Sequence, residues 1–271
     1  WQRWRSSRAM SQHCAVAELV LNDLLAVFWD VDGTLADTEM DGHRPAFNQA
    51  FKDLDLPFHW DADLYNKLLP IAGGLHRVRN YAKEQGLDLT DAQLAQLKER
   101  KRFHYFERVQ QGFVRFRPGV QRMLHLLHGA DIQQWIVTSS GQASVHALLD
   151  AAGDRIPPFV GVISADDVSA GKPSPEGYRL AVERSGVEPA HALAIEDSAA
   201  GFAAARDAGL SCLLTPSPWD PDLCGDVPGA AAVMDHLGDQ DCPLTVRQGP
   251  PCEDAMVTLK YLQSLLLTDP S

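Results

Sequence analysis

Two carboxylates stand at the end of an apolar stretch in LLAVFWDVDGT, residues 24–34. Asp30 closes the apolar run, Asp32 follows after one residue, and Gly33 and Thr34 come next. A carboxylate at the end of a buried strand is costly unless something pairs with it. Two of them, one residue apart, indicate a cation, a reaction, or both.

Polar groups also follow three later apolar runs. They are Thr138 and Ser139 after QQWIV, Lys172 in GKPSPEGY, and Glu196 and Asp197 in AIEDS. The carboxyl ends of parallel strands open on one edge of a sheet, so these groups are expected to converge with Asp30 and Asp32. Hydroxyl, ammonium and helix-start amide groups suit a phosphate. Two strand-end carboxylates, Asp30 and Asp197, with a backbone carbonyl suit Mg²⁺.

Each of these elements also has an ordinary structural explanation. A strand-end lysine usually makes a surface ion pair. Adjacent acids such as Glu196 and Asp197 are usually solvated in a loop, and the hydroxyls of Thr138 and Ser139 suit a helix cap. Their occurrence in order on four successive strand ends favours a phosphate site.

Apolar runs that alternate with amphipathic helical stretches must position these residues. The predicted strands are LLAVFWD (24–30), QQWIVTSS (133–140), FVGVISADDV (159–168) and HALAIED (191–197), with further candidates in LSCLLTPS and AAVMDHLGD. This alternation indicates an α/β fold with a doubly wound, Rossmann-like parallel sheet that has helices on both faces. From about Asp239 onward, a further strand and a closing helix are expected.

The stretch between the first two strands has a different character. Residues 40–116 are helical by pattern, most clearly in TDAQLAQLKERKRFHYFERV, and RFRPGV returns the chain to the sheet. We therefore expect a helical cap at 40–116 inserted into a core formed by 23–39 and 117–271. The cap aromatics Trp60, Phe103 and Phe106 are expected to be core residues rather than site residues.

Residues 1–22 are expected to be a tail or a targeting segment. The opening WQRWRSSRAMSQHCAVA holds three arginines and three serines, and no acid precedes Glu18. This composition resembles an organellar transit segment. The alternatives are a disordered tail or sequence upstream of a start at Met10. The expected location is the chloroplast stroma in the first case and the cytoplasm of a cyanobacterium otherwise.

Composition excludes several classes of partner. The chain has 271 residues and a formal net charge of −12, without a basic stripe, which argues against nucleic acid. No apolar run reaches the roughly 18 residues of a membrane span. The five cysteines are scattered without a C-x-x-C pair, so neither a disulfide framework nor a zinc site is indicated. Cys242 and Cys252 could form a redox pair, and two reduced thiols are the simpler explanation. A monomer is expected.

Four motifs carry a resemblance to a known family. DVDGTLADTE, VTSSGQ, GKPSPEGY and AIEDSAAG resemble the four motifs of the haloacid dehalogenase-like phosphohydrolase superfamily, and the helical insert is similar to its cap. DTEMDGHRPAFNQAF, WDADLYNKLL, GGLHRVRNY and RPGV resemble the CbbY-like branch, especially its plant and cyanobacterial members. That branch includes phosphatases of xylulose-1,5-bisphosphate, an inhibitory by-product of Rubisco in the Calvin cycle.

The resemblance implies roles at the strand ends. Asp30 attacks phosphorus and becomes an aspartyl-phosphate, while positioning and electrostatics supply most of the rate. Asp32 protonates the leaving alkoxide and later deprotonates the attacking water. Thr138, the amide of Ser139 and Lys172 hold the transferring phosphoryl group.

The resemblance also implies the metal ligands. Asp30, the backbone carbonyl of Asp32, and Asp197 ligate Mg²⁺, and Glu196 positions a ligand or a metal-bound water.

In the cap, the resemblance assigns substrate contacts. Glu39 and His43 contact the sugar hydroxyls, and a second, distal phosphate is bound by Gly73, Gly74, Arg77 and Lys101. Relatives typically read G-G-K-E-R where this chain has Leu75 and His76, so one positive charge is absent there. Simpler explanations are a solvated Lys101 and an ordinary hydrogen-bonded His43.

Sequence leaves other activities open. A phosphomutase of the β-phosphoglucomutase type uses the same two aspartates, and cap closure against water separates it from a phosphatase. A phosphatase of another small phosphate monoester is a further alternative. A phosphoacceptor signalling domain also has strand-end aspartates but lacks so large a cap. An inactive scaffold is disfavoured, because every catalytic position holds a competent residue.

Overall fold

A computed structural model describes residues 24–71, 73–217, 223 and 225–266. The predicted N-terminal segment, 1–22, lies outside the described residues, as do Cys14 and Cys224. The strands are β1 (Ala26–Trp29), β2 (Gln133–Val137), β3 (Gly161–Ile163), β4 (Ala192–Glu196), β5 (Ser211–Leu214), β6 (Ala232–Met234) and β7 (Val246–Gln248). The α-helices are α1 (Arg44–Asp53), α2 (Ala62–Leu68), α3 (Gly74–Glu84), α4 (Asp91–Gln110), α5 (Val120–Gly129), α6 (Gln142–Ala152), α7 (Glu176–Ser185), α8 (Ala199–Asp207) and α9 (Leu259–Leu265).

The seven strands form one sheet in the order β3-β2-β1-β4-β5-β6-β7. Strands β1 to β6 pair in parallel, which confirms the doubly wound core, and the polar strand ends therefore share one edge. The extra strand predicted near the C-terminus is β7, but it pairs antiparallel with β6, so the sheet is mixed. A short connection can reverse the chain, whereas a parallel pairing needs a long crossover.

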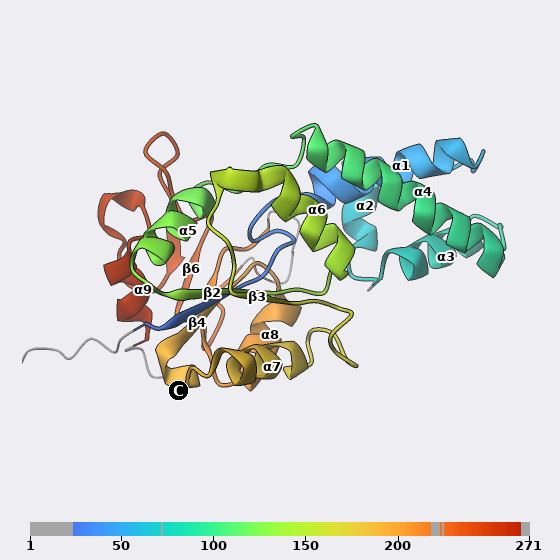
Figure 1. Cartoon of the computed structure of the whole chain (residues 1–271). Coiled ribbons are helices and arrows are strands. Elements are labelled where there is room, and N and C mark those ends of the chain that lie inside the picture. Colours follow the sequence, from blue (N-terminus) through green and yellow to red (C-terminus); the bar gives the residue numbers. More distant parts are fainter. Residues whose placement is uncertain (1–23, 72, 218–222, 224, 267–271) are drawn as a thin grey trace, which may run out of the picture.

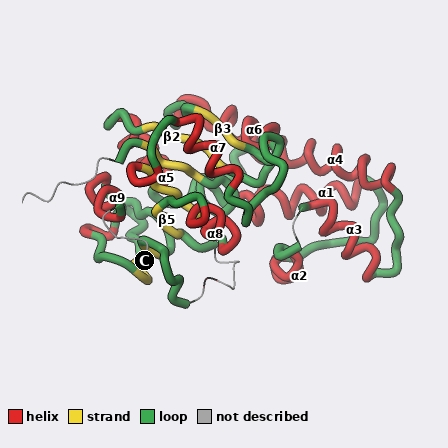
Figure 2. The backbone as a smooth tube through the Cα atoms, turned by 90° about the horizontal axis from the view of Figure 1, so that it is seen from below, coloured by secondary structure: helices red, strands yellow, loops and turns green. Residues whose placement is uncertain are grey.

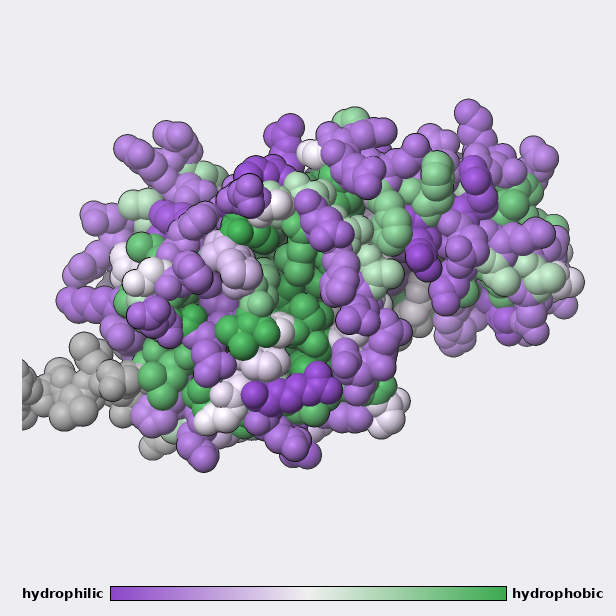
Figure 3. Space-filling model, viewed as in Figure 1, coloured by the Kyte–Doolittle hydropathy of each residue, from purple (hydrophilic) through white to green (hydrophobic). Residues whose placement is uncertain are grey.

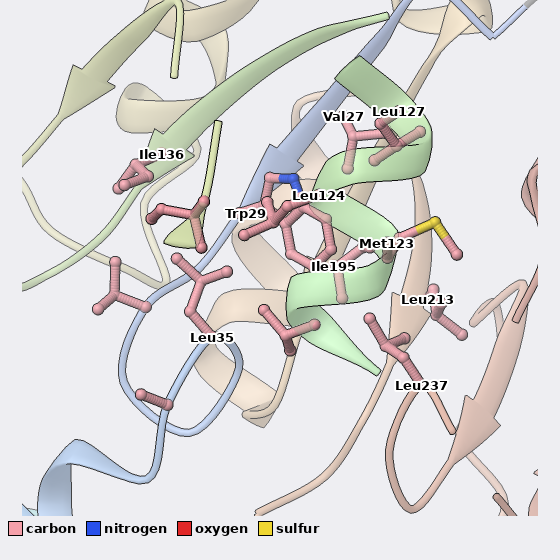
Figure 4. Close-up of a cluster of buried hydrophobic side chains, with 14 of the residues drawn as sticks. Val27, Trp29, Leu35, Met123, Leu124, Leu127, Ile136, Ile195, Leu213 and Leu237 are labelled. Atoms are coloured by element: carbon pink, nitrogen blue, oxygen red, sulfur yellow. The ribbon is translucent and has the colours of Figure 1, made fainter. Parts of the chain in front are cut away.

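Both faces of the sheet are buried, which explains why its strands read as continuous apolar runs. On one face, side chains of β1, β2 and β4 pack against α5, α6 and α9. Figure 4 shows part of this cluster, with Trp29 near Met123 and Leu124 of α5. On the other face, α7 and α8 complete a second apolar cluster.

Helices α1 to α4 lie together at one end of the molecule, beside the layered body (Figures 1 and 2). They have an apolar core of their own, in which Trp60 is fully buried among aromatic rings. Phe106 is a partly buried core residue, but it packs against the apolar cluster on the α5 face of the sheet rather than in the core of the cap. The prediction for Phe103 was wrong, since 49% of this residue is exposed. Phe103 lies under the guanidinium of Arg100 on the outer face of α4, and the cap surface is mostly hydrophilic in Figure 3.

The chain enters and leaves the cap at neighbouring points. Ala36 and Phe116 form an antiparallel bridge, and the amide of Arg117 donates to the carbonyl of Leu35 at 2.9 Å. The Arg117 guanidinium donates to the carbonyls of Gly33 and Thr215 and, at 2.5 Å, to that of Asp235. One partly buried arginine at the hinge thus holds three strand-end loops.

Candidate active site

Lys172 lies at the centre of the strand-end groups. Its Nζ is 2.6 Å from Asp30 Oδ1, 2.6 Å from Glu196 Oε1 and 2.9 Å from the carbonyl of Val137. Burial alone would lower the pKa of Lys172, but Asp30 and Glu196 raise it above its usual value, so the amine stays charged. The structure therefore brings the predicted lysine onto the predicted nucleophile.

Asp30, Glu196 and Asp197 form a buried acidic cluster. One oxygen from each lies within 4.8 Å of the others. Burial raises the pKa of Asp30 to about 7, with Lys172 opposing and Glu196 adding to the rise. Burial, followed by Asp30 and Glu196, also raises the pKa of Asp197 well above its usual value.

The donor set fits a divalent cation. Asp30 Oδ2 and Glu196 Oε2 are buried without a hydrogen-bond partner, although buried carboxylate oxygens normally have one. Oxygen ligands of this kind suit Mg²⁺, and its charge would relieve the repulsion among the three acids. The side chain of Asp32 is outside this cluster, which leaves only its backbone carbonyl for such an ion.

Asp32 has a different environment from Asp30. Ser140 Oγ donates to Asp32 Oδ2 at 2.6 Å, Thr38 Oγ1 donates to Oδ1, and His43 Nε2 is 3.6 Å from Oδ1. Burial alone would raise the pKa of Asp32, but these contacts, led by that with His43, hold it well below its usual range. Two carboxylates with pKa values pushed apart are suited to different roles in one reaction.

The loop after β2 contributes unequally. Ser139, Ser140 and Gly141 line the main cavity, whereas Thr138 lines a smaller hollow beside it. The hydroxyl of Thr138 accepts a hydrogen bond from the amide of Ser140 at 3.0 Å. Thr138 thus shapes the loop, and the structure does not bring it to the cavity wall with Ser139.

Close approach of backbone to carboxylates explains two glycines. Gly33 has φ +90°, and a Cβ there would lie 1.9 Å from Asp197 Oδ2. A Cβ on Gly201 of α8 would lie 1.9 Å from Glu196 Oε2. Larger residues would displace the acidic cluster at both positions.

A cavity of about 750 Å³ joins this cluster to the cap. His43 and Lys101 both line it, and Lys101 Nζ lies 2.9 Å from His43 Nδ1. Burial lowers the pKa of Lys101 to about 8, against the opposing effects of Glu39 and Asp32. Asp32, His43 and Lys101 therefore form a continuous polar line from the core into the cap.

Glu39 and Arg77 also line the cavity, and Tyr65 joins them. The Tyr65 hydroxyl donates to Glu39 Oε2 at 2.5 Å and accepts from Arg77 Nη1 at 3.0 Å. Arg77 donates further to the carbonyls of Leu68 and Leu69, at 3.0 and 3.3 Å. Most of its fork is thus used within the cap.

Gly73 and Gly74 line the cavity at the start of α3. A Cβ on Gly74 would lie 2.8 Å from the ring of Phe47, so the backbone passes close to the cap core. Leu75 follows on the cavity wall, at the position that lacks the positive charge.

Sequence reasoning missed four residues of the site. Ser140 and Thr38 lie within the quoted motifs, so hydrogen bonds from their hydroxyls to Asp32 could have been predicted. Lys98 lines the cavity one helical turn before Lys101, and the i, i+3 spacing in the sequence predicts that the two lie on the same face of the helix. Tyr65 could not be found, since a buried tyrosine in an apolar pattern resembles an ordinary core residue.

Among the described residues, Cys242 and Cys252 have separate partners. Cys242 Sγ lies 3.5 Å from His236 Nε2, and Cys252 Sγ contacts the carbonyl of Met256. Both are free thiols.

In the part of the chain that the structure describes, no helix has the length and apolar character needed to cross a membrane.

Comparisons with known proteins agree with this geometry. A family model for haloacid dehalogenase-like hydrolases matches residues 24–209. The plasmid-encoded protein CbbY of Cupriavidus necator is 38% identical over 228 residues, 81% of this chain and 88% of that protein. The CBBY-like protein of Arabidopsis thaliana is 33% identical over 245 residues, 87% of this chain and 76% of that protein.

Solved structures give the same answer. The crystal structure of a CbbY mutant from Rhodobacter sphaeroides in complex with xylulose-(1,5)bisphosphate is similar at a TM-score of 0.71 and 32% identity. It covers 80% of this chain and 98% of that one. Fold, site and similarity together show that the chain belongs to the haloacid dehalogenase-like hydrolase family, among its CbbY proteins, and is a hydrolase of phosphoric monoesters.

Proposed function

We propose that the chain is a Mg²⁺-dependent sugar phosphatase that works through an aspartyl-phosphate. The observation that carries this proposal is the pair Asp30 and Asp32, two residues apart, which line one cavity but have different partners. Asp30 contacts Lys172, whereas Asp32 accepts hydrogen bonds from hydroxyl groups. A nucleophile and a proton carrier need such separate environments.

The chemistry follows from these contacts. The Asp30 carboxylate attacks phosphorus, a bond from Asp30 oxygen to phosphorus forms, and the bond from phosphorus to the sugar oxygen breaks. Asp32 is a carboxylate in the substrate-free site, so it takes up a proton as the negatively charged phosphate binds beside it and gives that proton to the leaving alkoxide. As a carboxylate again, it then takes a proton from the water that releases phosphate. Lys172 neutralises charge at Asp30, and Ser139 and Gly141 offer amides at the start of α6.

A cation would be held by Asp30, Asp197 and the backbone carbonyl of Asp32, with Glu196 behind them. When bound, Mg²⁺ supplies positive charge against the phosphoryl oxygens. Glu196 is anchored by Lys172 and by the hydroxyl of Tyr178 at 2.6 Å, which suits a residue that positions ligands.

We propose xylulose-1,5-bisphosphate as the substrate and xylulose-5-phosphate as the product. The complex of the R. sphaeroides CbbY mutant with that bisphosphate supports this choice. At the cap end of the cavity, Arg77, Lys98 and Lys101 offer positive charge for a distal phosphate. Lys98 is exposed and lines the same cavity as Leu75, so it adds a positive charge to the cavity wall.

Two measurements test the proposal. Asp30→Asn should abolish Mg²⁺-dependent phosphate release and leave the far-ultraviolet circular dichroism unchanged, and substantial remaining turnover would refute the nucleophile. A panel of sugar mono- and bisphosphates, compared by kcat/KM, tests the substrate. A preference for hexose monophosphates, or isomer formation in place of phosphate release, would point to another phosphatase or to a mutase.

We also propose that the protein acts as a monomer in the chloroplast stroma or in the cytoplasm of a cyanobacterium. The location is supported by relatives that come from a bacterium and a plant. Light scattering of the purified protein tests the first point. Import of residues 1–22 fused to a fluorescent protein into isolated chloroplasts distinguishes the two locations.

A further inference from the structure

Glu39 is held by a residue from another helix of the cap. It begins a short π-helical segment, Glu39–His43, directly after the catalytic loop. Its Oε2 accepts a hydrogen bond from the hydroxyl of Tyr65, at 2.5 Å. Tyr65 lies in α2, 26 residues further along the chain, and is fully buried.

The Tyr65 hydroxyl is fixed from its other side by Arg77. Arg77 Nη1 donates to it at 3.0 Å, and the guanidinium lies 5.1 Å from the centre of the Tyr65 ring. Burial and the nearby Glu39 raise the pKa of Tyr65 well above 10, so its hydroxyl keeps the proton. Because it accepts from Arg77, that proton is directed at Glu39.

The two oxygens of Glu39 are therefore not equivalent. Oε2 is held by Tyr65, with Arg77 Nη1 3.9 Å away. Within the described part of the chain Oε1 has no hydrogen-bond partner, and Glu39 lines the cavity. An ionised carboxylate oxygen accepts hydrogen bonds only, so its natural partner is a donor such as a sugar hydroxyl.

We propose that Tyr65 is a positioning residue for substrate recognition: it fixes Glu39 Oε2 so that Oε1 is presented to the hydroxyl groups of a polyhydroxylated substrate. Arg77 acts behind it, as the anchor that orients Tyr65. The inference rests on the proposed function and adds that selectivity for hydroxyl-bearing substrates depends on a buried hydroxyl that the substrate itself need not touch.

Tyr65→Phe tests this directly, because it removes one oxygen and keeps the ring under Arg77. Tyr81→Phe is the matched control, since Tyr81 packs its ring on Phe58 and Trp60 in the same cap. Both variants are assayed with xylulose-1,5-bisphosphate and with phenyl phosphate, which has no hydroxyl groups. A hydrogen bond to a charged group is at stake, so Tyr65→Phe should lower kcat/KM for the sugar at least tenfold or so, mainly through KM.

Phenyl phosphate turnover should stay within about twofold of wild type in both variants, because it has nothing for Glu39 to accept. An unchanged kcat/KM for the sugar, or equal losses on both substrates, would overturn the positioning role. If wild type hydrolyses neither compound, the proposed function fails, and binding still decides the role of Tyr65. In calorimetry, Tyr65→Phe should then weaken xylulose-1,5-bisphosphate at least fivefold or so and leave inorganic phosphate unchanged; equal affinities would refute it.

Discussion

Replacing Lys101 with methionine is expected to stabilise the folded protein at neutral pH. The Lys101 ammonium lies between the rings of Phe47 and Tyr105, 5.1 and 5.3 Å from their centres, and contacts His43. Burial is the main cause that lowers the pKa of Lys101 from 10.5 to about 8. The charged form is thus less favourable in the folded protein than in the unfolded chain.

The magnitude follows from that difference. A fall from 10.5 to about 8 corresponds to about 3 kcal/mol of unfavourable free energy at pH 7. Methionine has a similar length and no charge to desolvate. Solvent in the cavity reduces the gain, as does the lost His43 contact, which is worth about 1 kcal/mol. We therefore expect Lys101→Met to be more stable by about 1–2 kcal/mol at pH 7.

The pH dependence gives the sign a second check. Between pH 8 and 10.5 the unfolded chain holds the Lys101 proton and the folded protein has lost it, so wild-type stability gains with rising pH. The variant lacks this gain. The advantage of Lys101→Met should therefore shrink through that window and vanish above it.

Urea unfolding at pH 7, 9 and 10.5 measures both effects. Lys98→Met is the control, because Lys98 is exposed on the same helix, and its stability should stay within about 0.5 kcal/mol of wild type. A Lys101→Met variant that is less stable than wild type at pH 7, or whose advantage does not depend on pH, would refute the reasoning. A stabilised but inactive variant would show that Lys101 is kept for function at a cost in stability.

Two further substitutions test contacts around the acidic residues. Gly201→Ala should destabilise the protein by about 2 kcal/mol, because the new Cβ displaces the buried side chain of Glu196. Gly129→Ala is the control, since a Cβ there meets nothing within 4 Å, and its melting temperature should equal or exceed that of wild type. Equal melting temperatures for the two variants would contradict the predicted clash with Glu196. Ser140→Ala should raise the pKa of Asp32 by removing a hydrogen bond. Ionised Asp32 stabilises the folded protein above the pKa that it has in the unfolded chain, and this stabilisation should be smaller in the variant. On acidification the variant should therefore unfold at a higher pH than wild type. An unchanged midpoint of acid unfolding would argue against this role of Ser140.

The core of the fold was predictable because its strands are buried on both faces. Runs such as LLAVFWD cannot be half-exposed strands, and polar groups at their ends must share one edge. That argument placed Asp30, Lys172 and Asp197 together, and the structure agrees. It works because a parallel sheet turns sequence order into spatial convergence.

The cap was less predictable, because its contacts depend on how helices pack. Period alone does not separate the solvent face of α4 from its inner face at Phe103, where Arg100 covers an exposed ring. Nor does it show that Tyr65 bridges Glu39 and Arg77, from three different elements. The direction in which β7 pairs with β6 was not predictable either, because so short a strand can pair in parallel or antiparallel.

The hinge has a consequence for how such enzymes diversify. Because Ala36 and Phe116 are paired, the chain leaves the core for the cap and returns to it at almost the same place. An insert of a different size or fold between these two points would leave the strand ends where they are. Arg117 links the insert to the catalytic residues. Its amide pairs with Leu35 at the point where the chain returns from the cap, and its guanidinium donates to the carbonyl of Gly33, next to Asp32.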